Sequence, residues 1–403
     1  MILNVKDFGA MGNGANLDTE AIQNAINSAK KGDTIHFSKG IYLTGTFSLK
    51  SDITLQIDPD AEISGSRNIE HYHDCGFYHN EMKQTVSLFY ALDCENIKVT
   101  GGGRIQLSGD SFANFDVFCP DHLDIETMTK EHIEQTVVAM GKRLTQPIFF
   151  NNCKNIEFSN VKVFNSPCWT LVFSNCDGVK IDNIYVDNHR RIPNNDGVHC
   201  SASQNISVTN STFLCGDDCF AGTCITNWDG VCKNILIENC LMYSRSAAIR
   251  FGHLSSKVEN AVVRNIKVLP SNRAISIFSG DDGVVKNITL ENIEATTYTH
   301  SGYWWGKGEG FVICADNSSG KIENITIKNS TFKQENASLV YAQNENVSDI
   351  TIENCKFEHI EGCAHPYYKS IIDLQPNHPD LLEKPYKDYQ DIYSKDVKNL
   401  KVI

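Results

Sequence analysis

Hydrophobic residues follow two different periods along this chain. Between Asp18 and Lys31 the segment DTEAIQNAINSAKK repeats its apolar residues at three- and four-residue spacing, which predicts an amphipathic helix capped by Asp18 or Thr19. From Asp33 onward the apolar residues recur at every second position, as in DTIHFS, GIYLTG and ITLQID, and this alternation predicts short strands. The pattern therefore predicts one helix followed by a long series of strands.

A repeated unit, Asn-(Ile/Val)-x-(Ile/Val), recurs through the strand region. The unit or a close variant begins at Asn96, Asn155, Gly178, Asn205, Asn234, Asn260, Asn287, Asn324 and Asp349. From Asn155 the intervals are 23 to 29 residues, apart from one of 37. A period in the twenties with strands and no helices is typical of a β-solenoid. We therefore predict an all-β solenoid with residues 1–32 as an N-terminal cap and with corner Asn residues that hydrogen-bond between coils.

Two insertions and a polar tail interrupt the repeat. Residues 107–147 contain DIETMTKEHIEQTVVAMGKR, which predicts a helix inside a long loop, and residues 296–311 form an aromatic, Gly-rich loop. Long loops on a rigid scaffold commonly carry function. Residues 362–403 are polar and contain proline, and we expect them to pack as a tail over the last coil. No linker divides the chain, so we expect a single domain over residues 1–403.

Composition narrows the range of partners. The net charge of −13 argues against nucleic acid or an anionic membrane as a partner. The N-terminal MILNVKDFGAMGNG lacks the features of a signal peptide, and no apolar run reaches the roughly 18–20 residues of a membrane-spanning helix. We therefore expect a cytoplasmic protein, or a secreted one if a signal has been removed. The 15 cysteines then predict buried, reduced thiols. The oligomeric state stays open.

Three carboxylates lie within the stretch Asn194–Asp218, NNDGVHCSASQNISVTNSTFLCGDD. Asp196 precedes the adjacent pair Asp217 and Asp218 by 21 residues, about one coil. Neighbouring coils would place these acids roughly 4.7–4.9 Å apart along the sheet. Such a cluster is unfavourable unless a reaction or a cation needs it. Taken singly, however, Asp-Gly and Gly-Asp-Asp are ordinary turn sequences.

The same residues carry a family resemblance. PNNDGVHC, CGDDCFA and FGHLS resemble, in this order, the N-T-D-G, G-D-D and G-H-G blocks of the polygalacturonases, glycoside hydrolase family 28. The N-terminal DFGA-x-G-x-G motif with its following helix is similar to the start of pectin-lyase-like proteins. The likeness extends in general form from about Val5 to Ile325. It implies a single-stranded right-handed parallel β-helix that works as an inverting glycoside hydrolase.

The resemblance also implies roles for four residues. Asp217 would be the general acid, Asp196 and Asp218 would hold and deprotonate the water, and His253 would adjust the protonation of the acid. Inverting hydrolysis needs carboxyl groups about 6.5–9.5 Å apart so that water fits between them, which one coil of separation allows. A neighbouring carboxylate also raises the proton affinity of one member of the cluster, as a general acid requires.

Four positions depart from the family pattern. Leu254 replaces the second Gly of G-H-G, and His199 stands where a second acid usually follows N-T-D-G. Ser276 and Phe278 occupy the expected positions of the Arg and Lys that bind the uronate carboxylate in the family. The resemblance therefore implies a retained reaction on a pectin-type or related oligosaccharide, with a specificity changed from polygalacturonan.

A further set of residues is predicted to bind the substrate, either as cations for an acid group or as part of the Trp-Gly-Lys-Gly-Glu loop: Asn194, His199, Arg250, Arg273, Trp305, Lys307 and Glu309. Arg190 and Arg191 are further possible cations. Trp304 and Trp305 are candidate platforms for a sugar ring, whereas Trp169 fits a platform or the core equally well. No set of four convergent ligands suggests a metal site, and no cofactor is expected.

Three other functions fit the same fold less well. A polysaccharide lyase needs a cationic base beside the uronate and usually calcium, and the missing Arg and Lys argue against it. A non-catalytic carbohydrate-binding solenoid has no need of all three acids and the histidine. An epimerase or transferase is not excluded. In each case the partner would be an oligosaccharide or polysaccharide.

Overall fold

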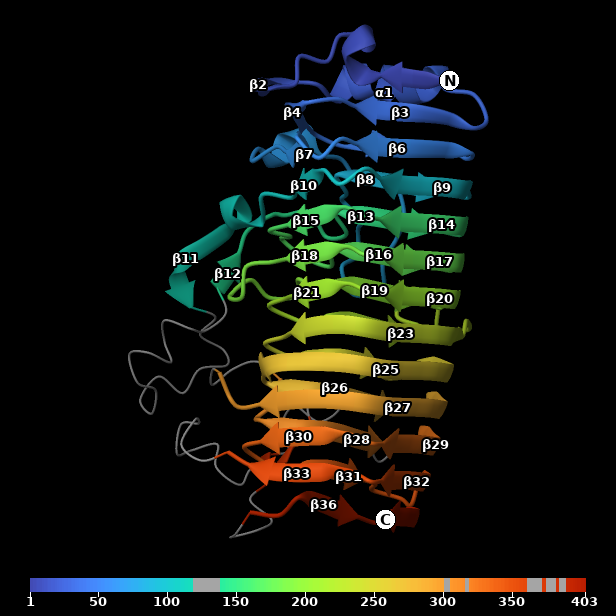
Figure 1. Ribbon diagram of the computed structural model, residues 1–403, viewed down its shortest axis with the longest axis vertical. Coiled ribbons are helices and arrows are strands. Elements are labelled where there is room, and N and C mark those ends of the chain that lie inside the picture. The colour runs from blue at the N-terminus through green and yellow to red at the C-terminus, as the bar shows by residue number, and fades with distance from the viewer. Residues whose placement is uncertain (119–137, 301–304, 316–318, 361–371, 375–381, 384–388) are drawn as a thin grey trace.

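The computed structural model describes residues 1–118, 138–300, 305–315, 319–360, 372–374, 382–383 and 389–403. These residues wind into one stack of coils that runs from the N-terminus to the C-terminus (Figure 1). Strands of successive coils pair in parallel, for example β13 (Ile148–Asn151) with β16 (Leu171–Ser174). The predicted parallel β-helix is confirmed. Within the described part of the chain, no helix is both long and apolar enough to cross a membrane.

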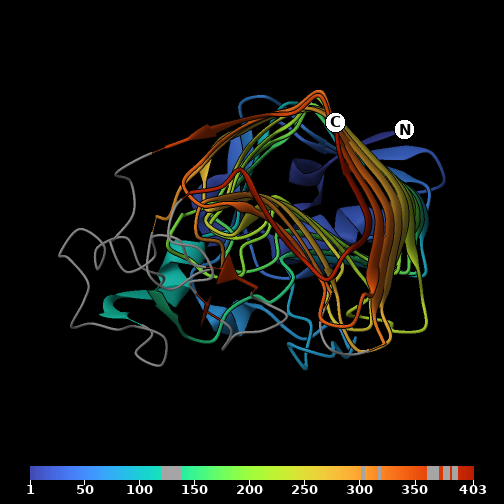
Figure 2. The same cartoon turned by 90° about the horizontal axis from the view of Figure 1, so that it is seen from below.

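Two parallel sheets, named here sheet A and sheet B, form the walls of the solenoid, which Figure 2 shows from one end of the stack. The 11 strands of sheet B are β5 (Phe47–Ser48), β8 (Phe89–Leu92), β13, β16, β19 (Val198–Ser201), β22 (Phe220–Thr223), β24 (Ala247–Phe251), β26 (Arg273–Ser279), β28 (Glu309–Ala315), β31 (Ser338–Tyr341) and β36 (Ile392–Lys395). The 22 strands of sheet A are β1 (Ile2–Asn4), β2 (Asn13–Leu17), β3 (Asp33–Phe37), β4 (Gly40–Thr44), β6 (Ile53–Ile57), β7 (Ala61–Gly65), β9 (Glu95–Thr100), β10 (Arg104–Gln106), β14 (Lys154–Ser159), β15 (Lys162–Phe164), β17 (Asp177–Asp182), β18 (Tyr185–Asp187), β20 (Gln204–Thr209), β21 (Thr212–Leu214), β23 (Cys232–Tyr243), β25 (Lys257–Ser271), β27 (Val284–Thr297), β29 (Lys321–Lys328), β30 (Thr331–Gln334), β32 (Val347–Glu353), β33 (Lys356–His359) and β37 (Lys398–Val402).

The helices and two short hairpin-like pairs lie outside these sheets. The helical elements are η1 (Val5–Phe8), α1 (Thr19–Ser28), η2 (Ile69–His71) and η3 (Gly109–Phe112). The predicted helix is α1, which lies at the N-terminal end of the stack and buries Ala21, Ile22, Ala25 and Ile26 (Figure 1). The antiparallel pairs are β11 (Ala113–Phe118) with β12 (Val138–Met140), and β34 (Ile372–Asp373) with β35 (Leu382–Glu383).

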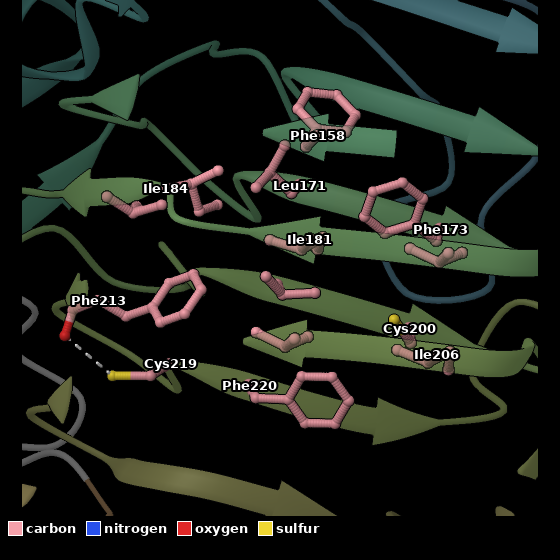
Figure 3. Packing of buried hydrophobic residues seen from close by; sticks show 14 of the residues in the cluster. Phe158, Leu171, Phe173, Ile181, Ile184, Cys200, Ile206, Phe213, Cys219 and Phe220 are labelled. Carbon is pink, nitrogen blue, oxygen red and sulfur yellow. Dashed lines mark hydrogen bonds between the residues drawn. The ribbon is translucent and has the colours of Figure 1, made fainter. Parts of the chain in front are cut away.

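The interior is filled by the alternate residues that the strand pattern predicted. Phe150 and Phe173 stack on adjacent coils with ring centroids 5.5 Å apart, and Phe158 meets Phe173 edge-on at 6.0 Å. Figure 3 shows the rings of Phe158 and Phe173 packed with Ile181 and Ile206 inside the stack. Burying one such side chain contributes about 1.5–3 kcal/mol. The repetition of this gain on every coil stabilises the stack.

The corner asparagines form two ladders of hydrogen bonds along sheet A. In the first ladder, Asn234 Nδ2 donates to Asn205 Oδ1 (3.0 Å), and two coils further Asn287 makes the same bond with Asn260 (3.1 Å). These residues have φ values of 57 to 61°, the left-handed region that Asn tolerates better than most residues. In the second ladder, Asn239 Nδ2 donates to Asn210 Oδ1, and Asn265 Nδ2 donates to Asn239 Oδ1. The predicted coil-to-coil role of Asn is confirmed.

Apolar clusters cover the outer face of sheet B at two places. The first, which we name the N-terminal outer cluster, comprises Phe149, Cys168, Trp169, Val172 and Ile225. The second, the C-terminal outer cluster, comprises Phe278, Val312, Cys314, Ala337, Leu339, Tyr341 and Leu374. The strands β19, β22 and β24 lie between them and present His199, Ala221 and Arg250 in register. The middle of this face is therefore the polar part.

The structure corrects the expectation about the tail and describes only the last residues of the helix predicted in the first insertion. Residues 392–402 are not a tail over the last coil, because β36 pairs with β31 and β37 pairs with β32 as one more coil. Asn399 even extends the first ladder, donating to Asp349 Oδ1 (3.0 Å). A helix was predicted within residues 124–143. Residues 124–137 lie outside the described residues, and Val138–Met140 form the strand β12.

The described cysteines are free thiols, and most of them are buried. Cys153, for example, contacts the backbone carbonyls of Ala91 and Asn151 inside the stack. Burial raises the pKa of the Cys232 thiol, as it does for several others. The prediction of buried, reduced thiols holds for this part of the chain.

Candidate active site

The three acids lie at the edge where the chain enters sheet B. Asp196 is two residues before β19 and Asp218 is two residues before β22, and Val198 pairs with Phe220. The two acids therefore occupy equivalent positions on adjacent coils, and the Gly197 amide donates to the Asp218 carbonyl (2.8 Å). The prediction that they lie on neighbouring coils is confirmed.

The glycine before the acid pair is required by crowding. A Cβ on Gly216 would lie 2.6 Å from the Ile192 carbonyl oxygen and 2.8 Å from Asn195 Oδ1. The same Asn195 oxygen accepts a hydrogen bond from the Gly216 amide (2.7 Å). The Gly-Asp-Asp turn is thus clamped against the preceding coil, which fixes the direction of Asp217 and Asp218.

Asp218 is held by three donors from one neighbouring segment. The Ser246 hydroxyl (3.0 Å) and the Ala247 amide (3.1 Å) donate to Oδ1, and Arg250 Nε donates to Oδ2. Both side chains are buried. Burial lowers the pKa of Arg250, but the charges of Asp218 and Asp196 outweigh this and raise it overall. Asp218 is therefore a fixed, charge-compensated carboxylate.

Asp196 has a different environment, because one of its oxygens has a histidine partner and the other has none. His199 Nδ1 lies 3.0 Å from Asp196 Oδ2, and His199 Nε2 lies 2.9 Å from Thr223 Oγ1. Oδ1 is buried and has no hydrogen-bond partner among the described residues. Burial and the charge of Asp218 raise the pKa of Asp196 well above its usual value. The open oxygen and the raised pKa suit the Asp196 carboxyl group to proton exchange.

His199 does not lie where a substrate contact was predicted. Its ring is fully buried against Trp169, with centroids 4.2 Å apart, and both nitrogens have protein partners. Burial, with Arg250 nearby, lowers the pKa of His199 to about 3, so the ring is neutral at pH 7. With its proton on Nδ1, the neutral ring donates to Asp196 when that carboxyl group is ionised, and it accepts from the Thr223 hydroxyl at Nε2. The geometry gives it the position of a residue that orients Asp196.

Asp217 accepts hydrogen bonds from the backbone of the two segments that carry the other acids. The Asn194 amide donates to Oδ2 (3.1 Å) and the Asp218 amide donates to Oδ1 (2.9 Å). Arg143, at the end of the first insertion, donates to Asn194 Oδ1 (3.2 Å) and to the carbonyls of Pro167 (2.9 Å) and Pro193 (3.2 Å). Arg143 therefore ties two adjacent turns together beside Asp217.

His253 contacts a fourth acid, which the sequence motifs did not reveal. Its Nε2 lies 3.4 Å from Glu81 Oε1, and Glu81 belongs to the loop between η2 and β8. Burial acts to raise the pKa of Glu81, but the hydrogen bond and charge of His253, with Arg250 and His199, leave it lowered. Gly252 turns the chain here with φ of 84°, and a Cβ would lie 1.9 Å from the Phe278 carbonyl oxygen.

Arg273, Lys307 and Glu309 form a buried group two to three coils beyond Asp218. Arg273 Nε lies 3.3 Å from Glu309 Oε2, and its Nη1 donates to Ser276 Oγ (3.2 Å). The Lys307 amide donates to Glu309 Oε2 (2.7 Å). All three were predicted as substrate contacts; their side chains are buried, and their contacts hold the segment 305–309 in place.

Two tryptophans differ in their placement. Trp305 is partly exposed, and the guanidinium of Arg250 lies over its ring at 5.6 Å from the centroid. Trp169 is buried in the N-terminal outer cluster between His199 and His79, which meets it edge-on at 4.8 Å. The platform alternative is therefore wrong for Trp169. Trp304 lies outside the described residues.

The structure thus brings Asp196, Asp217, Asp218, Asn194 and Arg250 into one network of contacts. Glu81 and Arg143 were missed because both come from loops outside the repeat, and the only signal was the length of those insertions. Among the described residues, no group of three or more His, Cys, Asp or Glu is arranged to hold a metal ion.

Comparison with known proteins decides the family. The family model for glycosyl hydrolases family 28 matches residues 27–362. The chain belongs to this family. An exo-poly-alpha-D-galacturonosidase of Dickeya chrysanthemi is 25% identical over 334 residues, covering 72% of this chain and 55% of that protein. An exopolygalacturonase of Cochliobolus carbonum is 28% identical over 380 residues, covering 86% of this chain and 72% of that protein. The match thus spans little more than half of the Dickeya protein.

Solved structures agree on the fold of this family 28 chain. The exopolygalacturonase of Thermotoga maritima aligns with a TM-score of 0.69 at 21% identity, over 99% of this chain and 92% of that one. A polygalacturonase of Erwinia carotovora aligns with a TM-score of 0.62 at 20% identity, over 85% of this chain and 90% of that one. These likenesses support the parallel β-helix architecture.

Proposed function

We propose that this protein is an inverting glycoside hydrolase that cleaves a pectin-type or related oligosaccharide. The observation that carries the proposal is the arrangement of the acids: Asp196 and Asp218 at one position on adjacent coils, with Asp217 bonded to both segments. Membership of family 28 and relatives named as exopolygalacturonases support the same reaction class.

In this proposal each of the three acids has a different role in hydrolysis. Asp217 protonates the leaving oxygen, as the family resemblance implies. Asp196 accepts a proton from the attacking water through its open Oδ1, and its raised pKa makes it a stronger base once it is ionised. Asp218, fixed by Arg250, supplies the charge that keeps the proton affinity of Asp196 high. His199 orients Asp196.

We further propose that the sugar bound on the C-terminal side of the acids carries no carboxylate. Ser276 accepts a hydrogen bond from Arg273, and Phe278 belongs to the C-terminal outer cluster, so neither offers the cation that the family pattern has at these positions. Glu81 adds a negative charge next to His253 on the same side. A uronate there would be repelled rather than bound.

The test is an incubation with a panel of neutral and uronate-containing oligosaccharides, with the products followed by mass spectrometry and by NMR of the anomeric proton. We expect one water gained per cleavage, with inversion at the new anomeric centre and with loss of activity in Asp217→Asn. Unsaturated products without added water would favour a lyase. Binding of a panel member without any cleavage would favour a non-catalytic binding protein.

A second experiment separates the acid from the base. An activated nitrophenyl glycoside of the sugar that the panel identifies needs little help from an acid. Asp217→Asn should therefore retain more activity on this substrate than on the oligosaccharide, whereas Asp196→Asn should lose both. The reverse pattern would exchange the two roles.

A further inference from the structure

The loop between η2 and β8 crosses the outer face of sheet B and contacts coils that come much later in the chain. The buried ring of His79 meets Trp169, two residues before β16, edge-on at 4.8 Å. The next residue, Asn80, donates from Nδ2 to the carbonyl of Ile225, two residues after β22 (2.5 Å). These two contacts fix the loop over the coils that carry the acids.

The ring of His79 also holds the backbone of the residues that follow it. His79 Nδ1 accepts hydrogen bonds from the amides of Glu81 (3.1 Å) and Met82 (3.0 Å). A nitrogen that accepts carries no proton, and burial lowers the pKa of His79 to about 4, so the ring is neutral at pH 7. The backbone of Glu81 is therefore held by a buried, uncharged ring.

The carboxylate of Glu81 is ionised and accessible. Its Oε1 lies 3.4 Å from His253 Nε2, and 38% of the side chain is exposed. Burial acts to raise the pKa of Glu81, but His253 and Arg250 leave it lowered. A carboxylate has about four lone-pair sites, so Glu81 can accept further hydrogen bonds while it keeps its contact with His253.

Glu81 lies close to the acids, on the side of β24. Burial, the charge of Asp218 and, among smaller effects, the charge of Glu81 raise the pKa of Asp196. Arg250 of β24, which donates to Asp218, acts on the pKa of Glu81 and has the Trp305 ring 5.6 Å from its guanidinium. An ionised carboxylate and an aromatic ring, delivered by two different segments, are thus placed near Arg250 and beside the acids.

We propose that Glu81 is a specificity-determining residue that accepts hydrogen bonds from the hydroxyl groups of a neutral sugar unit on the C-terminal side of the acids. A carboxylate bonds to hydroxyl donors and repels another carboxylate, so one group both selects and rejects. The Trp305 ring offers a surface to the face of the same sugar. The inference rests on the proposed hydrolase function and deepens it, because it assigns the choice of sugar to a loop outside the solenoid repeat.

The experiment measures binding in the Asp217→Asn background, where cleavage does not interfere. Calorimetric titrations compare an oligogalacturonide with its carboxyl-reduced form, which has the same rings and linkages but a hydroxymethyl group in place of each carboxylate. Glu81→Gln keeps the size of the side chain and removes its charge. As a matched control, Glu358→Gln removes a charge from an exposed pair with Lys333 (3.1 Å). Melting temperatures confirm that each variant is folded.

We expect the Asp217→Asn protein to bind the reduced form at least about tenfold more tightly than the acid form. Adding Glu81→Gln should weaken the reduced form about tenfold, as for one charge-assisted hydrogen bond, and should tighten the acid form. Glu358→Gln should change neither affinity.

Three results would overturn the proposal. The first is an acid form that binds as tightly as the reduced form when Glu81 is present. The second is a preference between the two forms that Glu81→Gln leaves unchanged. The third is an equal weakening of both forms by Glu81→Gln, because Glu81 would then only anchor its loop.

Failure of the hydrolase function would look different. In that case the protein with Asp217 intact would show the Glu81-dependent preference for the reduced form and release no product from any oligosaccharide of the panel. If hydrolysis proceeds while Glu81→Gln keeps the preference, the hydrolase function stands and the role of Glu81 does not.

Discussion

Two buried arginine–carboxylate pairs lie close together on the outer side of sheet B, and they differ in what surrounds them. Arg250 pairs with Asp218 within a group of further acids that includes Asp196, whose pKa is raised. Arg273 pairs with Glu309, which also accepts the Lys307 amide. The register of the strands relates the pairs, because Ala247, bonded to Asp218, pairs with Arg273.

The difference shows that a buried arginine–carboxylate pair can have two different roles in this fold. Beside Asp196, the Arg250 pair sets the charge of a group that has an open carboxylate oxygen. In the Arg273 pair, both partners are tied to the loop that ends at Glu309, and this loop brings Trp305 over Arg250. The first pair therefore acts on the chemistry and the second on the placement of a loop.

The largest expected effect follows from removing each arginine in turn. Without its guanidinium, Asp218 is a buried carboxylate next to Asp196, and the two cannot both ionise. Arg250→Gln should lower kcat by about 10²–10⁴-fold, the usual contribution of acid–base groups. Arg273→Gln should lower the melting temperature but keep kcat within about tenfold of the parent. Equal losses of kcat in the two variants would remove the distinction between the pairs.

The second effect is on stability. Glu309→Gln leaves Arg273 buried without its carboxylate, and breaking a buried pair costs about 3–5 kcal/mol of the free energy of unfolding. Glu238→Gln breaks the exposed pair with Arg264 and should cost only about 0.2–1 kcal/mol. Denaturant titrations of both variants make the comparison. A loss below about 1 kcal/mol for Glu309→Gln would mean that the loop is anchored elsewhere.

The third effect is a dependence of stability on pH, and Asp196 and Asp182 contribute to it with opposite signs. The pKa of Asp196 is raised in the fold by burial and by Asp218. Above the unfolded value of about 3.9, the folded state keeps a proton that the unfolded chain releases, so stability falls as pH rises through this window. Asp196→Asn should therefore melt at a higher temperature than the parent at pH 8, with a difference that shrinks towards pH 4.

Asp182 supplies the control of opposite sign. Hydrogen bonds from Thr209 and Asn210 lower its pKa, so its contribution is present above about pH 3.9 and is lost as pH falls. Asp182→Asn should melt below the parent at pH 8 and approach it at low pH. If the melting temperatures of both variants at pH 8 shift in the same direction relative to the parent, the pKa of Asp196 is not raised in the folded protein.

The sequence predicted the parts of the molecule that repeat. The repeated Asn units predicted the coils and their Asn ladders. The spacing of Asp196 and Asp218 predicted that they lie on adjacent coils, because one sequence period corresponds to one coil. Even the last coil had a signal, since Asn399-Leu400-Lys401-Val402 fits the repeat, but the 50 residues that separate Asn399 from Asp349 obscured it.

The parts that did not repeat were not predictable in this way. Glu81 contacts His253, which follows it by 172 residues (253 − 81) in the chain. The repeat gives no indication of this contact, because Glu81 lies in a loop outside it. His199 and Trp169 are buried because an apolar cluster covers the outer face of sheet B, whereas alternation alone places His199 on an outer, exposed side. Burial of an outward residue depends on the loops that cross the sheet, which the strand pattern does not encode.

The smallest expected effect concerns the contact that links the two pairs. The guanidinium of Arg250 lies 5.6 Å from the centroid of the Trp305 ring, and such cation–π contacts contribute about 0.5–2 kcal/mol. Trp305→Leu also removes the ring that is predicted to pack against a sugar, so it should weaken oligosaccharide binding by about 2- to 30-fold, measured by calorimetry in the Asp217→Asn background. Tyr78→Leu removes an exposed ring under Lys83 at 5.7 Å and should leave binding unchanged. If both variants bind as the parent does, Trp305 is not part of the substrate surface, and the Arg273–Glu309 pair anchors its loop for stability alone.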